Sequence, residues 1–439
     1  MTSTTTRLQK GPLIPVKTVL VRVLSGPDAG LEVETDDEVL TVGTAPGNLL
    51  KLTDDTVSRF HLELSGGESG IGVSDLGSSN ATAAGNVRIE RGVVPAGTEL
   101  RLGNTVLRVQ DGAAAVVELH AEDELDELKG QTEVMRRLMK QVTTAARSNV
   151  PVLVIGESGT GKELIARAIH ECSARTNGPF VTLDCGALAP NLVASELFGH
   201  ERGAFTGADR QHTGAFERAH GGTLFLDEIG ELPPELQPQL LGALERKRFR
   251  RVGGRTEIDT DVRIVCATNR DLRAEVNASV FRLDLYFRIA VVVLRVAPLR
   301  ERVADIPLLA AHFLKECGHE GSPEGVIPAR VMEELCAHRW PGNVRELRNW
   351  VEATVAMGES PELAAQTARG ATMPASSDGA LGNLSYKDAR SRVLEDFEKR
   401  YLTQLVADAG GNVALAARKA QMDRTYLIKL IQKHGLRAK

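Results

Sequence analysis

The sequence predicts a multidomain protein with an N-terminal all-β sandwich, a central α/β domain with a helical lid, and a C-terminal all-α domain. Its 439 residues are too many for one ordinary domain, because domains usually hold about 100–200 residues. Alternating apolar and polar runs fill the first part, wholly apolar runs alternate with helices in the middle, and amphipathic helices end the chain. The predicted segments are a sandwich at 17–110, a linker at 111–124, an α/β core at 125–297, a lid at 298–358, a linker at 359–385 and a helical domain at 386–439.

Composition favours a cytoplasmic protein that has no membrane partner. No apolar run approaches the roughly 20 residues of a membrane span, and the N-terminus lacks an apolar segment of signal-peptide length. The five cysteines form no CxxC or CxxH pair, so neither a disulfide framework nor a zinc site is indicated. The net charge of -5 conceals a basic end, because seven Lys or Arg residues follow Gly411 against one acid, Asp423.

The sandwich is predicted from short runs such as TVLVRVL, FHLELS and TELRLGNTVLRVQ, which alternate at period two between turn residues. Its segments VSRFH and DLGSSNAT resemble the loops of the forkhead-associated domain, which bind phosphothreonine. The resemblance implies that Ser58 and Arg59 contact the phosphate of a phosphothreonine protein or peptide and that Asn80 holds its backbone. His61 is expected to brace the loop.

One cation typical of that family is missing, because its Gly-Arg pair appears here as Gly43-Thr44. We expect the loss to weaken phosphate binding by about 1–2 kcal/mol. Two interpretations therefore remain: a phosphothreonine sensor, and a degenerate sandwich that serves only subunit contacts.

In the central domain, GESGTGKE follows the apolar run PVLVI and precedes a helix-compatible stretch. In this strand, loop and helix order, backbone N–H groups cradle phosphates and Lys162 adds a positive charge for the β- and γ-phosphates. Glu163 stands where a hydroxyl usually binds Mg²⁺, so the metal needs another ligand. The predicted ATP-binding residues here are Gly156, Glu157, Ser158, Gly159, Thr160, Gly161, Lys162 and Glu163.

Two later strand ends carry polar side chains. The run GGTLFLDE ends in Asp227, which suits Mg²⁺, and Glu228, which suits polarisation of an attacking water. An acidic pair at a strand end is often only a solvated terminus, but a position about 65 residues beyond a P-loop favours catalysis. Asn269 ends the run VRIVCATN, where its amide would bridge the water and the γ-phosphate, although such a residue also often begins a turn.

The order of these motifs resembles the AAA+ ATPases, and the strings themselves resemble the sigma-54 activator branch from about Leu128 to Ala356. The matching strings are GESGTGKE, ELFGHERGAFTGA, GGTLFLDEIGELP, ATNRDL, FRLDLYFRI, PLRERVADIP and WPGNVREL. The resemblance implies an ATPase with ATP and Mg²⁺ as cofactors that remodels closed sigma-54 RNA polymerase promoter complexes to the open form. It also implies self-association, from a dimer to a hexameric ring.

The segment GAFTGA distinguishes that branch. From its residues alone we expect a mobile loop between two helices with an exposed apolar tip, and an ordinary turn is the alternative. The resemblance implies that sigma-54 is contacted chiefly by Phe205 and Thr206, within a segment made of Gly203, Ala204, Phe205, Thr206, Gly207 and Ala208.

Three arginines are candidates for nucleotide contacts. Arg282 and Arg288 are six residues apart, or about 240° on a helix, so they would not serve one ligand equally. The residues alone favour a surface pair of Asp284 with Arg288, whereas the resemblance implies that one or both arginines reach a neighbouring subunit's γ-phosphate. The resemblance also implies that Arg345 senses nucleotide in its own subunit, and Trp340 is expected to pack.

Asp184 departs from the family, which usually carries Asn there to restrain the catalytic glutamate. We expect Asp184 to form a like-charge pair with Glu228 that raises the pKa of one of them. The coupling between the loop and hydrolysis therefore depends on this position.

The C-terminal segment GGNVALAARKAQMDRTYLIKLIQKHGL indicates two short helices around a tight turn. It resembles the Fis-type helix-turn-helix that ends many sigma-54 activators, which implies enhancer DNA as a partner; a generic helical hairpin with a basic face is the alternative. The expected DNA contacts are Arg424, Thr425, Tyr426 and Lys429 toward bases, and Arg418 and Lys433 toward phosphates.

Three functions are compatible with these motifs. The first is the regulatory ATPase, and the second is a DNA-binding regulator that uses the AAA+ unit only for oligomerisation. The third, an unrelated unfoldase, is disfavoured because no pore-type aromatic loop is evident. The presence of Lys162, Asp227, Glu228 and GAFTGA together favours the first.

Overall fold

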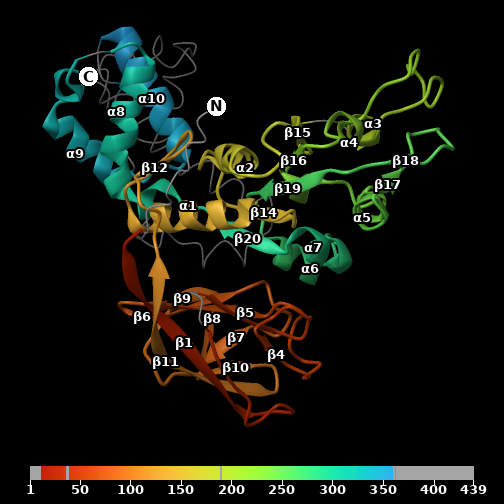
Figure 1. Cartoon of the computed structure of the whole chain (residues 1–439). Helices are drawn as coiled ribbons and strands as arrows, with labels where there is room; N and C mark the ends of the chain where they lie inside the picture. The colour runs from red at the N-terminus through yellow and green to blue at the C-terminus, as the bar shows by residue number, and fades with distance from the viewer. Residues whose placement is uncertain (1–10, 36–38, 188–189, 320, 359–360, 362–439) are drawn as a thin grey trace, which may run out of the picture. The chain divides into compact units, whose positions relative to one another are not determined.

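A computed structural model describes residues 11–35, 39–187, 190–319, 321–358 and 361, all within a compact unit that comprises residues 1–363 (Figure 1). The expected linker at 359–385 and the helix-turn-helix at 386–439 lie outside the described residues, apart from residue 361, as do all six expected DNA contacts. Among the helices that the structure describes, none combines the length and apolarity needed to span a membrane.

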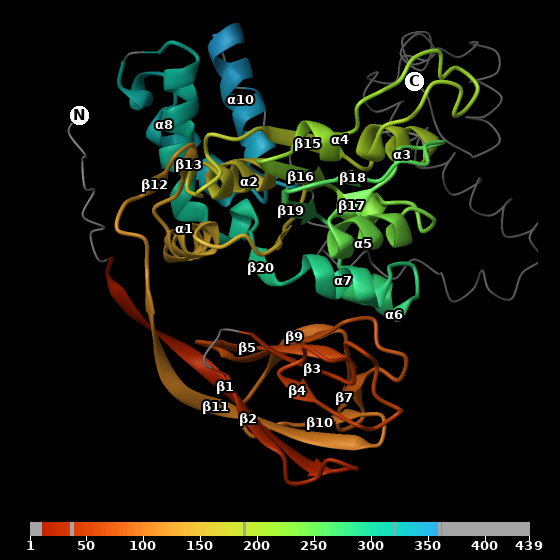
Figure 2. The ribbon, with the colours of Figure 1, turned by 45° about the vertical axis from the view of Figure 1, so that its right-hand side comes forward.

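The predicted β-sandwich is confirmed, and it consists of two sheets around one apolar core (Figures 1 and 2). Alternation in the first strand turns Val19, Val21 and Val23 to the same face, where each is at most 1% exposed. The first sheet has the order β2-β1-β11-β10-β7-β8, with β1 (Leu13–Ser25), β2 (Glu32–Glu34), β7 (Thr82–Ala84), β8 (Val87–Ile89), β10 (Glu99–Leu102) and β11 (Thr105–Glu118). The second has the order β4-β3-β5-β6-β9, with β3 (Val39–Gly43), β4 (Leu50–Lys51), β5 (Leu62–Gly67), β6 (Gly70–Asp75) and β9 (Arg91–Val94).

The linker predicted at 111–124 was wrong over its first part, because β11 continues to Glu118. It pairs with the beginning of β1, where Leu13 lies opposite Glu118 and Val16 opposite Ala115. Ladder hydrogen bonds join backbone groups, so an Ala-rich segment without apolar alternation still forms a strand when a partner lies beside it. The first residues of β1, from Leu13 onward, supply that partner.

The central domain has the predicted parallel sheet, in the order β15-β16-β19-β14-β20. The strands are mostly apolar between their ends because both faces of the sheet are covered. Val152 and Val154 pack against α1 and α2, whereas Leu153 between them packs into the cluster formed with α3 to α7. The strands of this sheet are β14 (Val152–Ile155), β15 (Phe180–Asp184), β16 (Thr223–Asp227), β19 (Arg263–Thr268) and β20 (Val292–Arg295).

Helices and short hairpins complete the core. The helices are α1 (Glu133–Ala146), α2 (Lys162–Glu171), α3 (Pro190–Phe198), α4 (Ala215–Arg218), α5 (Gln237–Arg246), α6 (Leu272–Asn277) and α7 (Leu283–Ile289), with the 3-10 turn η1 (Ile229–Glu231). The hairpins pair β12 (Glu124–Leu125) with β13 (Leu128–Lys129), and β17 (Arg248–Phe249) with β18 (Ile258–Asp259).

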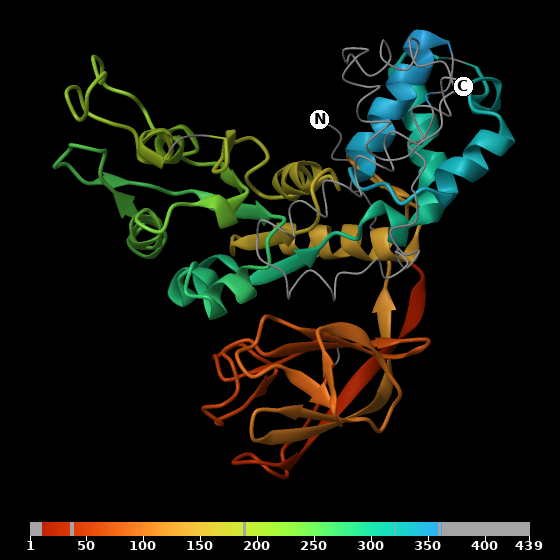
Figure 3. The same cartoon turned by 180° about the vertical axis from the view of Figure 1, so that it is seen from behind.

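The predicted helical lid is confirmed, and its helices lie together at one side of the core, as the view from behind also shows (Figures 1 and 3). Trp340 is fully buried in the lid core, and its indole N–H donates to the Leu335 carbonyl at 2.8 Å, as expected for a packing residue. The lid contains the 3-10 turns η2 (Leu299–Glu301), η3 (Val303–Asp305) and η4 (Pro323–Gly325), and the helices α8 (Ile306–Glu316), α9 (Ala329–Ala337) and α10 (Asn343–Met357).

Candidate functional site

The glycine-rich segment forms the turn between β14 and α2. Gly159 and Gly161 have φ values of 76° and 101°, which L-residues with a Cβ rarely adopt. Gly161 is the N-cap of α2, so the free N–H groups of the first helical turn face this loop. The Lys162 side chain is 7% exposed, and its ammonium donates to the Gly156 carbonyl at 3.0 Å. The loop therefore holds a cation and helix N–H groups together, which is an arrangement suited to phosphates.

The structure brings three of the predicted catalytic residues together at this loop. The Glu228 carboxylate lies 3.4 Å from the Lys162 ammonium, and its other oxygen accepts the backbone N–H of Asn269 at 3.1 Å. Glu228 has φ 46°, a left-handed conformation that non-glycine residues seldom adopt and that is enriched at functional sites. The turn after β16 thus aims Glu228 at the glycine-rich loop.

Asp184 lies beside Asp227 and not, as expected, beside Glu228, and the pKa of Asp227 is raised. Register places Asp184 directly beside Asp227 on neighbouring strands. The pKa of Asp227 is raised, first by burial and then by the charges of Glu228 and Asp184. Asp184 itself accepts two backbone N–H groups, from Gly186 at 2.8 Å and from the next residue at 3.1 Å.

Asp227 also fits the expected role as a Mg²⁺ ligand. One or two carboxylates suffice for Mg²⁺ when nucleotide phosphates and water complete its shell. Within the described residues there is no cluster of three or more metal-binding side chains, so the fit is to a shared protein–nucleotide site.

The lid contacts the glycine-rich loop through side chains that sequence reasoning had partly missed. Arg300 pairs with Glu157 in two bonds of 2.6 and 2.8 Å and, by that hydrogen bond first, lowers the pKa of Glu157 to about 2. Asn343 donates to the Ser158 carbonyl at 3.0 Å, and the Arg345 guanidinium donates to the Ser158 hydroxyl at 3.2 Å. The strings PLRERVADIP and WPGNVREL contained these residues, but only Arg345 had been singled out.

A cavity of about 430 Å³ lies between the end of the glycine-rich loop, α2 and the lid. Apolar groups of Leu164, Ile165 and Phe313 line it beside Gly161. A mixed apolar and polar pocket next to a phosphate-binding loop has the character of a site for a planar organic group.

The two arginines of FRLDLYFRI do not share one helix face. The ion pair expected between Asp284 and Arg288 is not formed, because both side chains have other partners. Arg282 is the N-cap of α7 rather than a helical residue, and it pairs with Asp284 at 2.7 Å. Arg288 instead donates to the Leu244 carbonyl at 2.8 Å. Asp284 is held by Arg282 because the extended N-cap conformation turns that side chain back over the first helical turn.

The GAFTGA segment forms the expected loop between α3 and α4. Gly203 donates its N–H to the Ala208 carbonyl at 2.8 Å, which closes the tip, and Phe205 is 38% exposed with its ring 4.9 Å from that of His200. Beneath the loop, Arg251 bridges Glu201 and Glu217. The tip is an apolar side chain on a short loop whose base is held by charges.

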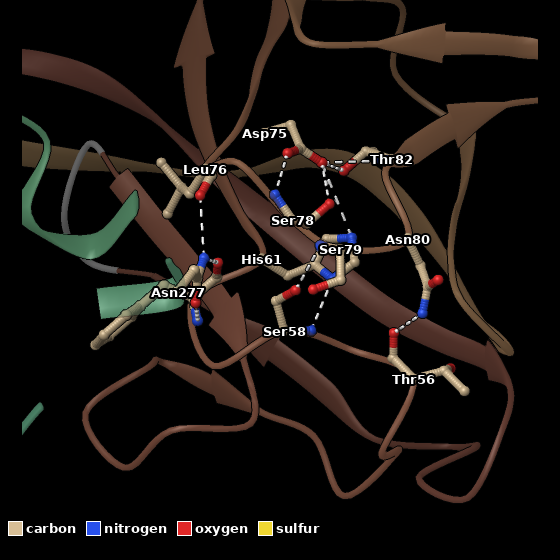
Figure 4. Close-up of polar contacts among 11 residues, drawn as sticks. Thr56, Ser58, His61, Asp75, Leu76, Ser78, Ser79, Asn80, Thr82 and Asn277 are labelled. Carbon is tan, nitrogen blue, oxygen red and sulfur yellow. Dashed lines mark hydrogen bonds and ion pairs between the residues drawn. The ribbon is translucent and has the colours of Figure 1, made fainter. Parts of the chain in front are cut away.

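At one end of the sandwich, the predicted phosphopeptide residues surround a cavity of about 520 Å³. The Ser58 hydroxyl accepts the N–H of Ser79 at 3.0 Å, and the Asn80 amide donates to the Thr56 carbonyl at 2.8 Å (Figure 4). His61 is fully buried and its Nδ1 accepts the Ser58 N–H at 3.1 Å, which confirms it as a loop brace. Burial above all lowers the pKa of His61, so the neutral ring that accepts this bond is favoured.

A second cation of this cavity was missed from the sequence. Lys51, at the end of β4, is exposed and lines the cavity together with Arg59 and Thr44. The strand β4 has only two residues, so no alternation of apolar and polar residues could predict which way Lys51 faces. Lys51 thus supplies a positive charge at the end of the sandwich where Thr44 supplies none.

Three family models match the chain. The Sigma-54 interaction domain matches residues 128–295, the AAA+ ATPase lid domain matches 300–378, and the model described as Inner membrane component of T3SS, cytoplasmic domain, matches 22–113.

Relatives and solved structures agree with the first two matches. The Response regulator protein PilR of Pseudomonas aeruginosa is 45% identical over 70% of this chain and 70% of its own length. The Nif-specific regulatory protein of Azotobacter vinelandii is 49% identical over 58% of this chain and 50% of its own length. The crystal structure of NtrX from Brucella abortus in complex with ATP is 36% identical, covers 71% of this chain and 69% of that chain, and has a TM-score of 0.52.

For the sandwich, the FHA domain of the CT664 protein from Chlamydia trachomatis is 27% identical over 22% of this chain and 99% of that chain, with a TM-score of 0.21. That score is too low to support an assignment.

Proposed function

The chain belongs to the family of sigma-54-dependent activators that includes PilR and NtrC, and we propose that it hydrolyses ATP to remodel a closed sigma-54 RNA polymerase promoter complex to the open form. The observation that carries the proposal is the cluster of Lys162, Glu228 and Asn269 at the glycine-rich loop, with contacts of 3.4 and 3.1 Å. The geometry suits phosphoryl transfer to water, for which positioning and charge stabilisation provide most of the catalysis.

In this proposal each residue has a separate task. The Lys162 ammonium leaves the Gly156 carbonyl for the β- and γ-phosphates, which offer it charge-assisted bonds. Glu228 then orients the attacking water and takes up its proton, while Asn269 holds the water from the neighbouring strand end. Asp227 would hold Mg²⁺, and the ion would supply positive charge that offsets the negative charge of the phosphates.

The arginines divide between the subunit's own nucleotide and the neighbour's. We propose that Arg345 contacts nucleotide in its own subunit, because it already bonds to Ser158 of the glycine-rich loop. Arg282 and Arg288 are assigned to a neighbouring subunit in a hexameric ring. Their present partners, Asp284 and the Leu244 carbonyl, are groups that either arginine can exchange for a phosphate.

ATP turnover by the purified chain tests the catalytic assignment. Glu228→Gln should keep nucleotide binding but reduce turnover by about 100-fold or more, since loss of a general base removes that much. Glu245→Gln, an exposed carboxylate on α5, is the matched control and should turn over ATP like the natural protein. Equal, slow turnover by all three proteins would support the alternative, a DNA-binding regulator in which the AAA+ unit only oligomerises.

We propose that the GAFTGA loop contacts sigma-54 through Phe205 and Thr206. Phe205→Ala should abolish sigma-54 binding and leave ATP turnover largely intact, because the loop lies outside the cluster around Glu228. Leu192→Ala, which truncates another exposed apolar side chain on α3, should leave sigma-54 binding intact. Undiminished binding of sigma-54 by the Phe205 variant would remove the role assigned to this loop.

The ends of the chain complete the proposed activator. We propose that residues 386–439 bind enhancer DNA, with Arg424 and Lys429 among the base contacts. Arg424→Ala should therefore abolish a gel shift with enhancer DNA without changing ATP turnover. A shift that persists at the same protein concentration would contradict this role.

We further propose that the sandwich binds phosphothreonine. Ser58, Arg59 and Lys51 line one cavity and together offer a hydroxyl and two cations, which suit a phosphate dianion. Calorimetry with phosphothreonine peptides should show binding that Arg59→Ala removes. Absence of binding to every member of a phosphothreonine library would favour the scaffold role instead.

A further inference from the structure

The loop that carries the phosphate-binding residues is hydrogen-bonded to helix α6 of the ATPase core. The Asn277 amide accepts the N–H of Phe60 at 3.3 Å and donates to the Phe60 carbonyl at 2.6 Å. It also donates to the Leu76 carbonyl at 3.0 Å (Figure 4). One side chain of the core therefore engages both loops of the cavity, 58–61 and 75–82. Both of its amide hydrogens and its oxygen are committed to the sandwich.

Apolar packing surrounds this amide. Phe60 is 3% exposed, and its ring lies edge-on to Tyr286 with centroids 5.1 Å apart and tilted to Phe287 at 6.1 Å. Phe60 follows Arg59 directly in the chain. Movement of the phosphate-binding residues is thereby tied to the packing of α7.

A buried charge lies at the same contact, away from the cavity. Glu63 on β5 is 13% exposed, and one of its oxygens accepts bonds from Arg273 and Arg295, each at 2.6 Å. Arg273 is 6% exposed, and Glu63 at 2.6 Å compensates its charge more closely than Asp271 at 3.7 Å. The residues that line the cavity do not include Glu63.

The cavity itself includes the ATPase core. Asn277 forms part of its wall, and the Arg59 guanidinium donates to the Ser279 hydroxyl at 3.3 Å. A phosphate is a stronger acceptor than a hydroxyl and would draw that guanidinium toward itself. The docked sandwich thus has one of its phosphate-binding groups already engaged by the core.

We propose that phosphothreonine and the α6–α7 surface compete for the same end of the sandwich, so that binding of a phosphothreonine protein or peptide releases the sandwich from the ATPase core. This rests on the proposed sensor function. Because α7 follows Arg282 directly and contains Arg288, release alters the segment that carries the proposed trans arginines. Because the peptide binds the released sandwich, a change that weakens docking strengthens phosphothreonine binding by at most the factor by which docking is weakened.

The test measures the affinity of a fluorescent phosphothreonine peptide library for the full chain by anisotropy, with the unphosphorylated library as the blank. Glu63→Gln weakens docking without touching the cavity, and it should tighten binding by about tenfold, within the 5–150-fold range of typical coupling. Glu99→Gln, which breaks an exposed pair between Glu99 on β10 and Arg108 on β11, is the matched control and should bind like the natural protein.

A second variant covers failure of Glu63→Gln to fold. Ser279→Ala removes only the hydroxyl that engages Arg59 and should also tighten binding. Hydrogen exchange gives an independent readout, because the phosphopeptide should increase exchange of the amides in α6 (Leu272–Asn277).

The possible failures are distinguishable. Equal affinities for the natural protein, Glu63→Gln and Ser279→Ala, with unchanged exchange in α6, would overturn the competition while leaving the sensor function intact. Binding of the library to none of the proteins would instead overturn the sensor function, and the competition with it.

Discussion

Replacement of Gly159 by alanine tests whether the lid and the glycine-rich loop act as one unit. Gly159 has φ 76°, where an alanine loses about 1–2 kcal/mol. The added Cβ would also lie 2.3 Å from the carbonyl oxygen of Gly342, at the N-cap of α10. No flexible side chain can move aside to relieve this clash, because the Gly342 carbonyl belongs to the backbone. The start of α10 must therefore shift away from the loop.

That shift removes three hydrogen bonds between lid and loop. They are Asn343 to the Ser158 carbonyl at 3.0 Å, Arg345 to the Ser158 hydroxyl at 3.2 Å, and the Arg345 N–H to the Gly159 carbonyl at 3.3 Å. At about 1 kcal/mol each, the loss is about 3 kcal/mol. If ATP binds to the arrangement in which the lid contacts the loop, its affinity should fall roughly 100-fold.

The assay is titration with a fluorescent ATP analogue, together with thermal unfolding. Gly318→Ala is the matched control, because Gly318 has φ 83° in the lid but its added Cβ meets nothing within 4 Å. It should show only the backbone cost of about 1–2 kcal/mol in stability and an unchanged affinity for ATP. Equal ATP affinities for the two variants would show that ATP binding does not depend on contact between the lid and the glycine-rich loop.

Three further predictions concern other parts of the molecule. The pKa of His61 is lowered by its burial, so below about pH 6.5 the unfolded chain binds more protons than the folded one, and the sandwich loses stability as pH falls. Thermal scans from pH 7.5 to 5.5 should show the melting temperature falling, and it should fall less steeply with pH in His61→Asn. Trp340→Ala should destabilise the lid by about 3–5 kcal/mol in denaturant unfolding, whereas Trp340→Phe should cost about 1–3 kcal/mol because the Leu335 carbonyl loses its donor; a neutral Trp340→Ala would contradict the packing role. Lys51→Ala should weaken phosphothreonine binding roughly tenfold in calorimetry, and unchanged affinity would show that Arg59 alone balances the phosphate.

The sequence alone predicted the features that depend on neighbours in the chain. Alternation at period two predicted the sandwich, and wholly apolar runs between helices predicted the parallel sheet, because side-chain direction follows directly from local backbone geometry. The glycine-rich turn was recognisable for the same reason, since Gly159 and Gly161 and the lysine that follows them act within one turn of chain.

Contacts between distant segments were decided only by the tertiary structure. Asn277 bonds to Phe60 across 217 residues, and Arg300 pairs with Glu157 across 143. Asp184 was expected beside Glu228, yet strand register sets it against Asp227. Spacing along a chain carries no information about which strand pairs with which or which loop meets which helix. The catalytic motifs were therefore visible in the sequence, whereas the attachment of the sandwich to the ATPase core depends on packing that only the folded chain brings about.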